Sequence, residues 1–423
     1  MRFRHRSLAL CAIAGLSVTA CSSTPSTSSP SSPAATSPVT ATTAAPTTTT
    51  IDPALAQSYV EPGPFPVGVT TATMTNGVKV EIWYPAVAGS SGTETYDARD
   101  FTDPVLRSLL SGNVDATVSY AATRDAGVAD GKFPVVLNSH GASGWRSVSS
   151  FLTSHLASWG MVVVSPDHAS RDLYHLVSNL ANLTGGGAGS TTTTAATPDT
   201  SNTTTTIDPK ALARFNESVD DLLGSLDFIT AQNTDTASRF NGHLDLDHVG
   251  ALGHSAGGGT ILKASLDPRV DGYVSMASGI FTTQTELPAK PSFFLSGAID
   301  QIAKTERTYK AYLSVPTPSL FWSIDGAGHN AFDDLCTLGG GKGIIGVAEA
   351  SGLGPFLDSA PLVRKLGSDG CLPPAAPVTT TFPIIQHAVT AWFLQLFCKD
   401  ATPKGLDPSV SGSYAVKVTI EQR

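Results

Sequence analysis

The sequence is short of charge, and its charges are not predominantly basic. Only 14% of the 423 residues are charged, and 26 Lys and Arg stand against 35 Asp and Glu, which leaves a net charge of −9. Nucleic-acid binding needs a basic patch, and no such cluster is visible, so we set that class of protein aside. Hydrophobic residues nevertheless make up 41% of the chain, which is enough for a sizeable core.

Cysteine is scarce and never occurs as a Cys-x-x-Cys pair. Such close pairs are typical of structural zinc sites, so we expect no metal site from these residues and no cofactor. The preferred disulfide is Cys336–Cys371, which leaves Cys398 as a buried thiol on an amphipathic helix. The sequence alone leaves the other pairings open. The cysteines are Cys11, Cys21, Cys336, Cys371 and Cys398.

The N-terminal apolar run, Ser7–Ala20, is too short for an ordinary membrane span, which needs about 20 apolar residues. Three arginines precede it, so residues 1–20 are typical of an export signal peptide. The sequence Val18-Thr19-Ala20-Cys21 resembles the lipobox of bacterial lipoproteins, in which Cys21 becomes the lipid-modified first residue. We therefore expect an exported protein held at the membrane of the cell envelope by a lipid on Cys21. The alternatives are a secreted protein with a plain signal, or an uncleaved anchor.

Low-complexity segments divide the rest of the chain. Residues 22–50 are Ser, Thr, Pro and Ala apart from Val39, a composition that cannot bury a core and, with Cys21, predicts a disordered linker over residues 21–50. We expect one globular domain over residues 51–423. Within it, residues 185–206 are rich in Gly and Thr and predict a low-complexity insert, which is either a tolerated surface insertion or a functional lid.

Strand and helix patterns alternate through the globular part. Val69–Met74 and Val78–Tyr84 predict a hairpin that turns at Asn76-Gly77. The alternation predicts an α/β fold in which helices cover both faces of a mostly parallel central sheet. The further strands are expected at Phe133–Asn138, Met161–Ser165, Val249–Leu252, Gly272–Met276, Ser292–Ser296 and Ser319–Ile324, and the main helices at Arg214–Gln232, Ala256–Ala264 and Pro383–Phe397.

One motif points to nucleophilic chemistry. Residues 253–257 read Gly-His-Ser-Ala-Gly, which matches G-x-S-x-G, a pattern that places serine at a tight strand-to-helix turn. An apolar strand precedes the motif directly, and a helix-compatible run follows it. The alternative is a glycine-rich turn with an idle serine. Because of this context we take Ser255 as the candidate nucleophile.

A serine hydroxyl needs a base to take its proton and a third group to orient that base. In hydrolases with this motif the chain order is Ser, acid, His. Only His329 and His387 follow Ser255. His329 lies in a glycine-containing loop after a strand, whereas His387 falls inside the last predicted helix, so we favour His329. Asp300 lies just past a strand end and is the favoured acid. The less favoured acids are Asp267, Asp325, Asp333 and Asp334.

The oxyanion of an acyl-transfer reaction needs two fixed donors, and the loss of one typically lowers the rate by about 10²–10³. We assign one to the N–H of Ala256, directly after the nucleophile. The other is assigned to Ala142, in the loop after the strand Phe133–Asn138. His140 in the same loop is expected to brace it, and Trp145 is expected either to line the acyl pocket or simply to pack. His168 and His254 are expected to be structural.

Several short motifs together resemble the platelet-activating factor acetylhydrolase-like group of the α/β-hydrolase superfamily, and dienelactone hydrolase-like enzymes share some of them. The resemblance implies the α/β-hydrolase fold and metal-independent hydrolysis of short acyl or lipid esters. It implies the triad Ser255, Asp300 and His329, with Ala142 and Ala256 as the oxyanion hole. The motifs are Gly63–Gly68, Trp83–Pro85, Ser139–Gly141, Ser165–His168, Gly253–Gly258 and Gly328–Phe332.

These observations predict a serine-dependent carboxylic ester hydrolase of the cell envelope that works through an acyl-enzyme on a small-molecule or lipid ester. Two alternatives remain. One is an acyltransferase that uses the same triad, and the other is a non-catalytic surface protein with this fold. The insert Gly185–Thr206 and the long stretch Gly339–Pro374 after His329 depart from the group's pattern, so the identity of the substrate does not transfer.

Overall fold

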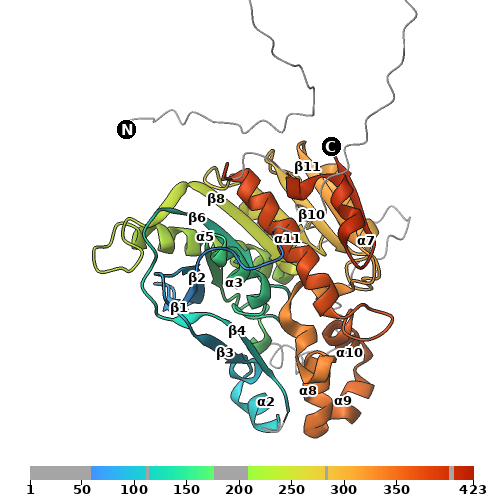
Figure 1. Ribbon diagram of the computed structural model, residues 1–423. Helices are drawn as coiled ribbons and strands as arrows, with labels where there is room; N and C mark the ends of the chain where they lie inside the picture. The colour runs from blue at the N-terminus through green and yellow to red at the C-terminus, as the bar shows by residue number, and fades with distance from the viewer. Residues whose placement is uncertain (1–58, 111–113, 176–207, 282–283, 400–403) are drawn as a thin grey trace, which may run out of the picture.

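The structure is a computed structural model, and it describes residues 59–110, 114–175, 208–281, 284–399 and 404–423 (Figure 1). The expected signal peptide, the linker over residues 21–50 and the insert Gly185–Thr206 lie outside the described residues.

A ten-stranded sheet forms the centre of the described part. In chain order its strands are β1 (Val67–Thr73), β2 (Lys79–Pro85), β5 (Thr123–Arg124), β6 (Phe133–Ser139), β7 (Val162–Pro166), β8 (Leu244–His254), β9 (Gly272–Met276), β10 (Ser292–Gly297), β11 (Ser319–Ile324) and β12 (Val418–Gln422). Across the sheet the order is β12-β11-β10-β9-β8-β6-β7-β2-β1-β5. The strands from β7 to β11 pair in parallel. By contrast, β12, β2 and β1 add antiparallel edges.

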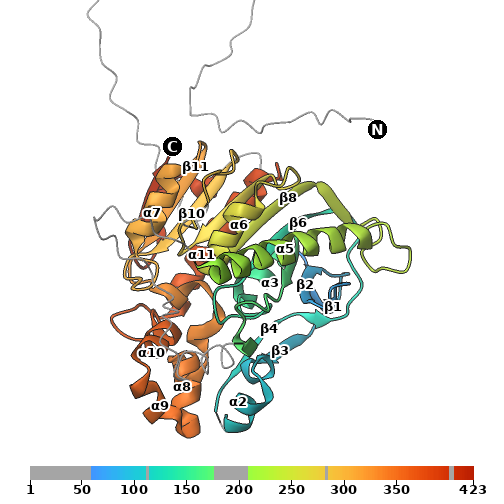
Figure 2. The ribbon, with the colours of Figure 1, turned by 180° about the vertical axis from the view of Figure 1, so that it is seen from behind.

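Helices cover both faces of the sheet. On one face lie α3 (Ser150–Ser158) and α11 (Val378–Leu396) (Figure 1). On the other face lie α5 (Pro209–Gln232), α6 (Ala256–Ala264) and α7 (Thr305–Ser314) (Figure 2). Each face has its own apolar cluster of buried side chains. The predicted fold class, a mostly parallel sheet between two helical layers, is therefore confirmed.

Parallel strands that are buried on both faces need continuous apolar runs. This explains why the central strands could be predicted from the sequence. All seven residues of β6 are buried, and the predicted bounds of α6, β9 and β11 match the structure. The hairpin of β1 and β2 also forms, with Gly77 at a positive φ of 86° in its turn.

Smaller elements lie beyond one end of the sheet, where both views place α2 and the α8–α10 group (Figures 1 and 2). A third apolar cluster, which includes Tyr96, Trp145 and Leu338, joins them to the main body. They comprise a two-stranded sheet of β3 (Thr93–Asp97) and β4 (Thr117–Ala121), with α2 (Pro104–Leu109), α8 (Ile344–Ala348), α9 (Gly354–Ser359) and α10 (Pro361–Ser368). Single helical turns occur at Ala98–Phe101, His329–Phe332, Asp334–Thr337, Gly339–Gly341, Glu349–Leu353, Lys404–Leu406 and Pro408–Ser413.

The structure joins Cys336 to Cys371, the pairing preferred from the sequence, with Cα atoms 4.8 Å apart. The expectation for Cys398 is wrong. Helix α11 ends at Leu396, and Cys398 follows it with a positive φ of 53°. The residue is exposed rather than buried. None of the helices in the described ranges is both long and apolar enough to cross a membrane.

Candidate active site

Ser255 occupies the sharp turn between β8 and α6, with a φ of 54° and a ψ of −120°. A non-glycine residue rarely adopts such a backbone conformation, and in proteins this strain is concentrated at functional sites. The flanking glycines make the turn possible. A Cβ atom on Gly257 would lie 1.8 Å from the carbonyl oxygen of Ser139, and one on Gly253 would lie 2.5 Å from the backbone of Gly257. The motif is therefore required by close backbone packing.

His329 lies beside Ser255 although 74 residues separate them. The hydroxyl of Ser255 donates to Nε2 of His329 over 2.8 Å. The imidazole is almost fully buried, and it belongs to the turn that follows β11. The other downstream histidine, His387, is buried in α11, and its Nε2 donates to the carbonyl oxygen of Gly405. Only His329 of these two contacts the serine.

Asp300 completes the chain of contacts on the far side of the imidazole. Nδ1 of His329 donates to Oδ2 of Asp300 over 2.8 Å. The other carboxylate oxygen accepts from the backbone N–H groups of Ile302 and Ala303, each over 2.7 Å. Burial alone would raise the pKa of Asp300, but these hydrogen bonds and the charge of His329 outweigh it and lower the pKa below its usual value. The carboxylate is therefore ionised at neutral pH and faces the imidazole.

Two residues that the sequence did not single out hold the turn that carries His329. Oδ2 of Asp369 accepts from the backbone N–H groups of both His329 and Gln301, over 3.2 and 2.9 Å, so one carboxylate ties the loop of the base to the loop of the acid. Nε2 of His254 donates to the carbonyl oxygen of His329 over 2.9 Å, and its Nδ1 lies 3.2 Å from Oδ2 of Asp333. The structural role expected for His254 is consistent with these contacts.

The loop His140–Gly144 after β6, here called the β6 loop, crosses directly over the nucleophile. A Cβ atom on Gly141 would lie 3.2 Å from Cβ of Ser255. Ala142, the next residue, is exposed, and Ala256 is the first residue of α6, where backbone N–H groups have no partner within the helix. Ala256 thus directly follows Ser255, and Ala142 directly follows the glycine that packs on Ser255.

His140 and Trp145, in and beside the β6 loop, have structural roles. Nδ1 of His140 donates to the carbonyl oxygen of Gly141, and its Nε2 accepts from the backbone N–H of His168, so His140 braces the loop as expected. Trp145 is 1% exposed and stacks on Phe101 with ring centroids 5.4 Å apart. Between the two roles considered for Trp145, the structure favours packing.

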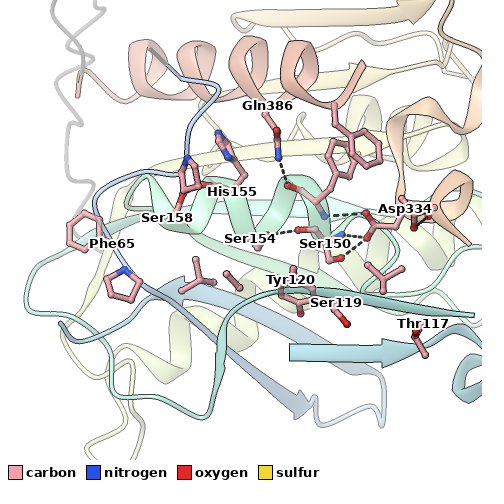
Figure 3. Close-up of a pocket in the computed structure, with 18 residues that line it drawn as sticks. Phe65, Thr117, Ser119, Tyr120, Ser150, Ser154, His155, Ser158, Asp334 and Gln386 are labelled. Atoms are coloured by element: carbon pink, nitrogen blue, oxygen red, sulfur yellow. Dashed lines mark hydrogen bonds between the residues drawn. The ribbon is translucent and has the colours of Figure 1, made fainter. Parts of the chain in front are cut away.

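A groove of about 480 Å³ runs beside α3 and is lined by Phe65, Tyr120, Ser150 and Gln386 among others (Figure 3). None of Ser255, His329 and Asp300 lines it, so it is separate from the site built here. In the described ranges, no group of three or more His, Cys, Asp or Glu is arranged to hold a metal ion.

Comparisons with known proteins agree with this architecture. Residues 61–179 match the family described as platelet-activating factor acetylhydrolase, isoform II. A ferulic acid esterase from Streptomyces cinnamoneus superposes with a TM-score of 0.54 and 19% identity, covering 85% of this chain and 98% of that one. The fold is that of the α/β-hydrolases. In such a hydrolase the nucleophile follows a central strand and starts a helix, as Ser255 does between β8 and α6.

The sequence similarity confirms the resemblance to platelet-activating factor acetylhydrolases. The enzyme of that name from Cavia porcellus is 25% identical to this chain over 290 residues, which cover 63% of this chain and 62% of that protein. The chain therefore spans about three fifths of the length of the curated relative that it matches. The family match over residues 61–179 includes the β6 loop but ends before Ser255, so the geometry of the three side chains is an independent observation.

Proposed function

We propose that this protein is a serine-dependent carboxylic ester hydrolase in which Ser255, His329 and Asp300 form the catalytic triad. The hydrogen-bonded chain from the Ser255 hydroxyl through the His329 ring to the Asp300 carboxylate carries the proposal, with both distances at 2.8 Å. This arrangement activates a hydroxyl that is otherwise a poor nucleophile. The names of the similar proteins, an acetylhydrolase and an esterase, support an ester as the substrate.

In the proposed reaction, Oγ of Ser255 attacks the ester carbonyl carbon while Nε2 of His329 accepts the hydroxyl proton. The Asp300 carboxylate stabilises the imidazolium that results. The backbone N–H groups of Ala142 and Ala256 bind the oxyanion of the tetrahedral intermediate. The C–O bond to the alcohol then breaks, and His329 returns the proton to the leaving alkoxide, which leaves an acyl-enzyme on Ser255.

A water molecule completes the turnover. His329 takes a proton from the water as it attacks the acyl carbonyl, and the second tetrahedral intermediate collapses to release the carboxylic acid and the free serine hydroxyl. If an alcohol took the place of this water, the same residues would perform acyl transfer. Product analysis in the presence of an added alcohol separates the two reactions, because a new ester would appear only with acyl transfer.

The function is tested with p-nitrophenyl esters of increasing acyl length. We expect the domain over residues 51–423 to hydrolyse short-chain esters and the variant Ser255→Ala to lose this activity while it keeps the same thermal unfolding midpoint. Ser147 provides a matched control because it is a buried serine near the β6 loop and has no role in the proposed reaction. Equal hydrolysis by wild type and Ser255→Ala would contradict the proposal.

We further propose that the protein acts at the cell envelope, held to the membrane by a lipid on Cys21. The support is the sequence alone, in which a basic start, a short apolar run and a cysteine stand in the order of a lipoprotein signal. A tether such as residues 21–50 would let the hydrolase reach esters at or near the membrane surface.

A further inference from the structure

Arg171 lies behind the β6 loop, and its guanidinium contacts three different segments. Nη2 donates to Oγ of Ser139 at the end of β6, over 2.7 Å, and to the carbonyl oxygen of His140, over 2.8 Å. Nη1 donates to Oγ1 of Thr260 in α6, over 2.7 Å. One side chain therefore joins the strand that leads into the β6 loop, the loop itself and the helix that begins after Ser255.

These contacts lead to both proposed oxyanion donors. The backbone carbonyl of Arg171 accepts from the N–H of Ser143, the residue after Ala142, over 2.7 Å. The hydroxyl of Thr260 in turn donates to the carbonyl oxygen of Ala256 over 3.0 Å. Arg171 thus holds the β6 loop by its backbone and its side chain, and it reaches the first residue of α6 through a single hydroxyl group.

The positive charge of Arg171 is buried without a carboxylate in direct contact among the residues that the structure describes. Within the described residues, no carboxylate lies within 4.0 Å of its guanidinium, and its Nε is buried without a hydrogen-bond partner. Burial lowers the pKa of Arg171 to about 9, against the opposing charge of Asp221, so the group remains charged at neutral pH. Buried charges are normally paired, since an unpaired one is costly.

Asp221, whose charge acts on Arg171, contacts a histidine instead. Oδ2 of Asp221 lies 3.4 Å from Nδ1 of His168, and Nε2 of His168 lies 2.9 Å from Oγ of Ser139. Burial raises the pKa of Asp221 to about 7 and lowers that of His168 well below its usual value. A neutral His168 accepts the hydroxyl proton of Ser139, whose oxygen then faces Arg171. This Ser–His–Asp series is fully buried at Ser139 and His168, so it orients Arg171 rather than reacting with a substrate.

We propose that Arg171 is a positioning residue that fixes the two halves of the oxyanion hole relative to each other and places a buried positive charge behind them, where the tetrahedral oxyanion forms. A preorganised charge aimed at a developing anion stabilises the transition state without stabilising the bound ester to the same extent. The inference rests on the proposed function, because it concerns the same reaction at Ser255.

The test compares Arg171→Met, which removes the charge and the donors, with Arg171→Lys, which keeps a cation but not the fork of donors. Arg239→Met is the matched control, because Arg239 binds Tyr84, Ala126 and Asp125 and no residue of the site. For each variant, kcat and KM are measured with p-nitrophenyl acetate. The inhibition constant is measured for a trifluoromethyl ketone, which forms a tetrahedral oxyanion on the serine.

For Arg171→Met we expect kcat to fall about 10- to 100-fold, within the range for weakened oxyanion stabilisation. KM should change little, and the inhibition constant should rise by about the same factor as kcat falls. Arg171→Lys should recover part of both losses, and Arg239→Met should behave as wild type. A merely structural role would not produce this matched change in kcat and inhibition, because partial unfolding lowers the active fraction without weakening the inhibitor.

If Arg171→Met does not fold, Thr260→Val breaks one of the same links with a side chain of nearly the same shape, and a fall in kcat at unchanged KM is again expected. If folded Arg171 variants keep the wild-type kcat and inhibition constant, the inference is overturned and the proposed function stays intact. A rise in KM alone would have the same consequence. Absence of Ser255-dependent turnover in the wild type would instead overturn the proposed function, and this inference with it.

Discussion

At the scale of single residues, the orientation of the His329 ring depends on one carboxylate. Asp300 accepts from Nδ1 of His329, which fixes the tautomer that presents Nε2 to Ser255. For Asp300→Asn we expect kcat to fall about 10³–10⁴-fold, because the amide favours the wrong tautomer and cannot stabilise an imidazolium. Steady-state kinetics on the folded variant checks this, and a loss of less than about 10-fold would place the triad acid elsewhere.

Asp334 gives a prediction about pH. Its carboxylate accepts from Ser150 (Figure 3) and from Tyr96 and Phe151, yet burial raises its pKa from 3.8 to about 7. Between pH 4 and 7 the unfolded chain has therefore lost a proton that the folded protein keeps. Because the folded state binds more protons, this group destabilises the fold increasingly as the pH rises through that range.

The variant Asp334→Asn removes this titration. We expect the free energy of unfolding of wild type, relative to that of Asp334→Asn, to decline by on the order of 2–4 kcal/mol from pH 4 to pH 7. Urea unfolding at several pH values measures the difference. A constant difference between the two proteins across this range would show that Asp334 is ionised throughout.

Local patterns were sufficient to name the three side chains that meet in the candidate site. Ser255 was predictable because the backbone packs so closely around its turn that only glycine is tolerated on either side. His329 and Asp300 were predictable because the chain order of such hydrolases restricts the choice. Asp369 was not predictable, because it acts through backbone N–H groups of loops that are 68 and 40 residues away in sequence. No spacing rule connects such positions.

At the scale of elements, the disulfide fixes the segment that supports His329. Cys371 follows Asp369 and Gly370, and the backbone of Gly370 packs so closely on Gly328 that a Cβ atom on Gly328 would lie 2.4 Å from it. The bond closes a loop between residues 35 apart, which in the chain-entropy model stabilises a protein by about 3–4 kcal/mol.

We therefore expect the double variant Cys336→Ser, Cys371→Ser to lose stability of this order and to lose activity at lower denaturant concentrations than those that unfold the sheet. Parallel measurements of activity and far-UV circular dichroism against urea concentration check both points. Coincident loss of activity and secondary structure would mean that the segment does not support His329 independently of the main fold.

The elements that were not predicted from the sequence lack apolar runs or depend on distant contacts. Alternate residues of β3 and β4 are exposed, and the two strands are short and polar, so their pattern is weak. Within the described part of the chain, strand β12 lies at an edge of the sheet and pairs only with β11. The helix pattern that was extended to Cys398 in fact stops at Leu396, since the chain turns there into a left-handed conformation.

At the scale of the whole molecule, we expect the proposed lipid on Cys21 to determine where the protein is located but not how fast it reacts. We expect the full-length protein, expressed in a bacterium that processes lipoproteins, to sediment with membranes and Cys21→Ala to shift to the soluble or secreted fraction. Both should have the same kcat on a soluble ester, because the proposed catalytic residues lie in the globular domain. Unchanged membrane fractionation of Cys21→Ala would count against the anchor.

The central claim is that Ser255 is the nucleophile, and covalent labelling tests it most directly. The protein is treated with a fluorophosphonate probe, digested and mapped by peptide mass spectrometry. We predict a single adduct on Ser255 that is absent from Ser255→Ala and strongly reduced in His329→Ala, because the hydroxyl needs the imidazole to accept its proton. No adduct on the wild type, or an adduct that persists in Ser255→Ala, would contradict the account.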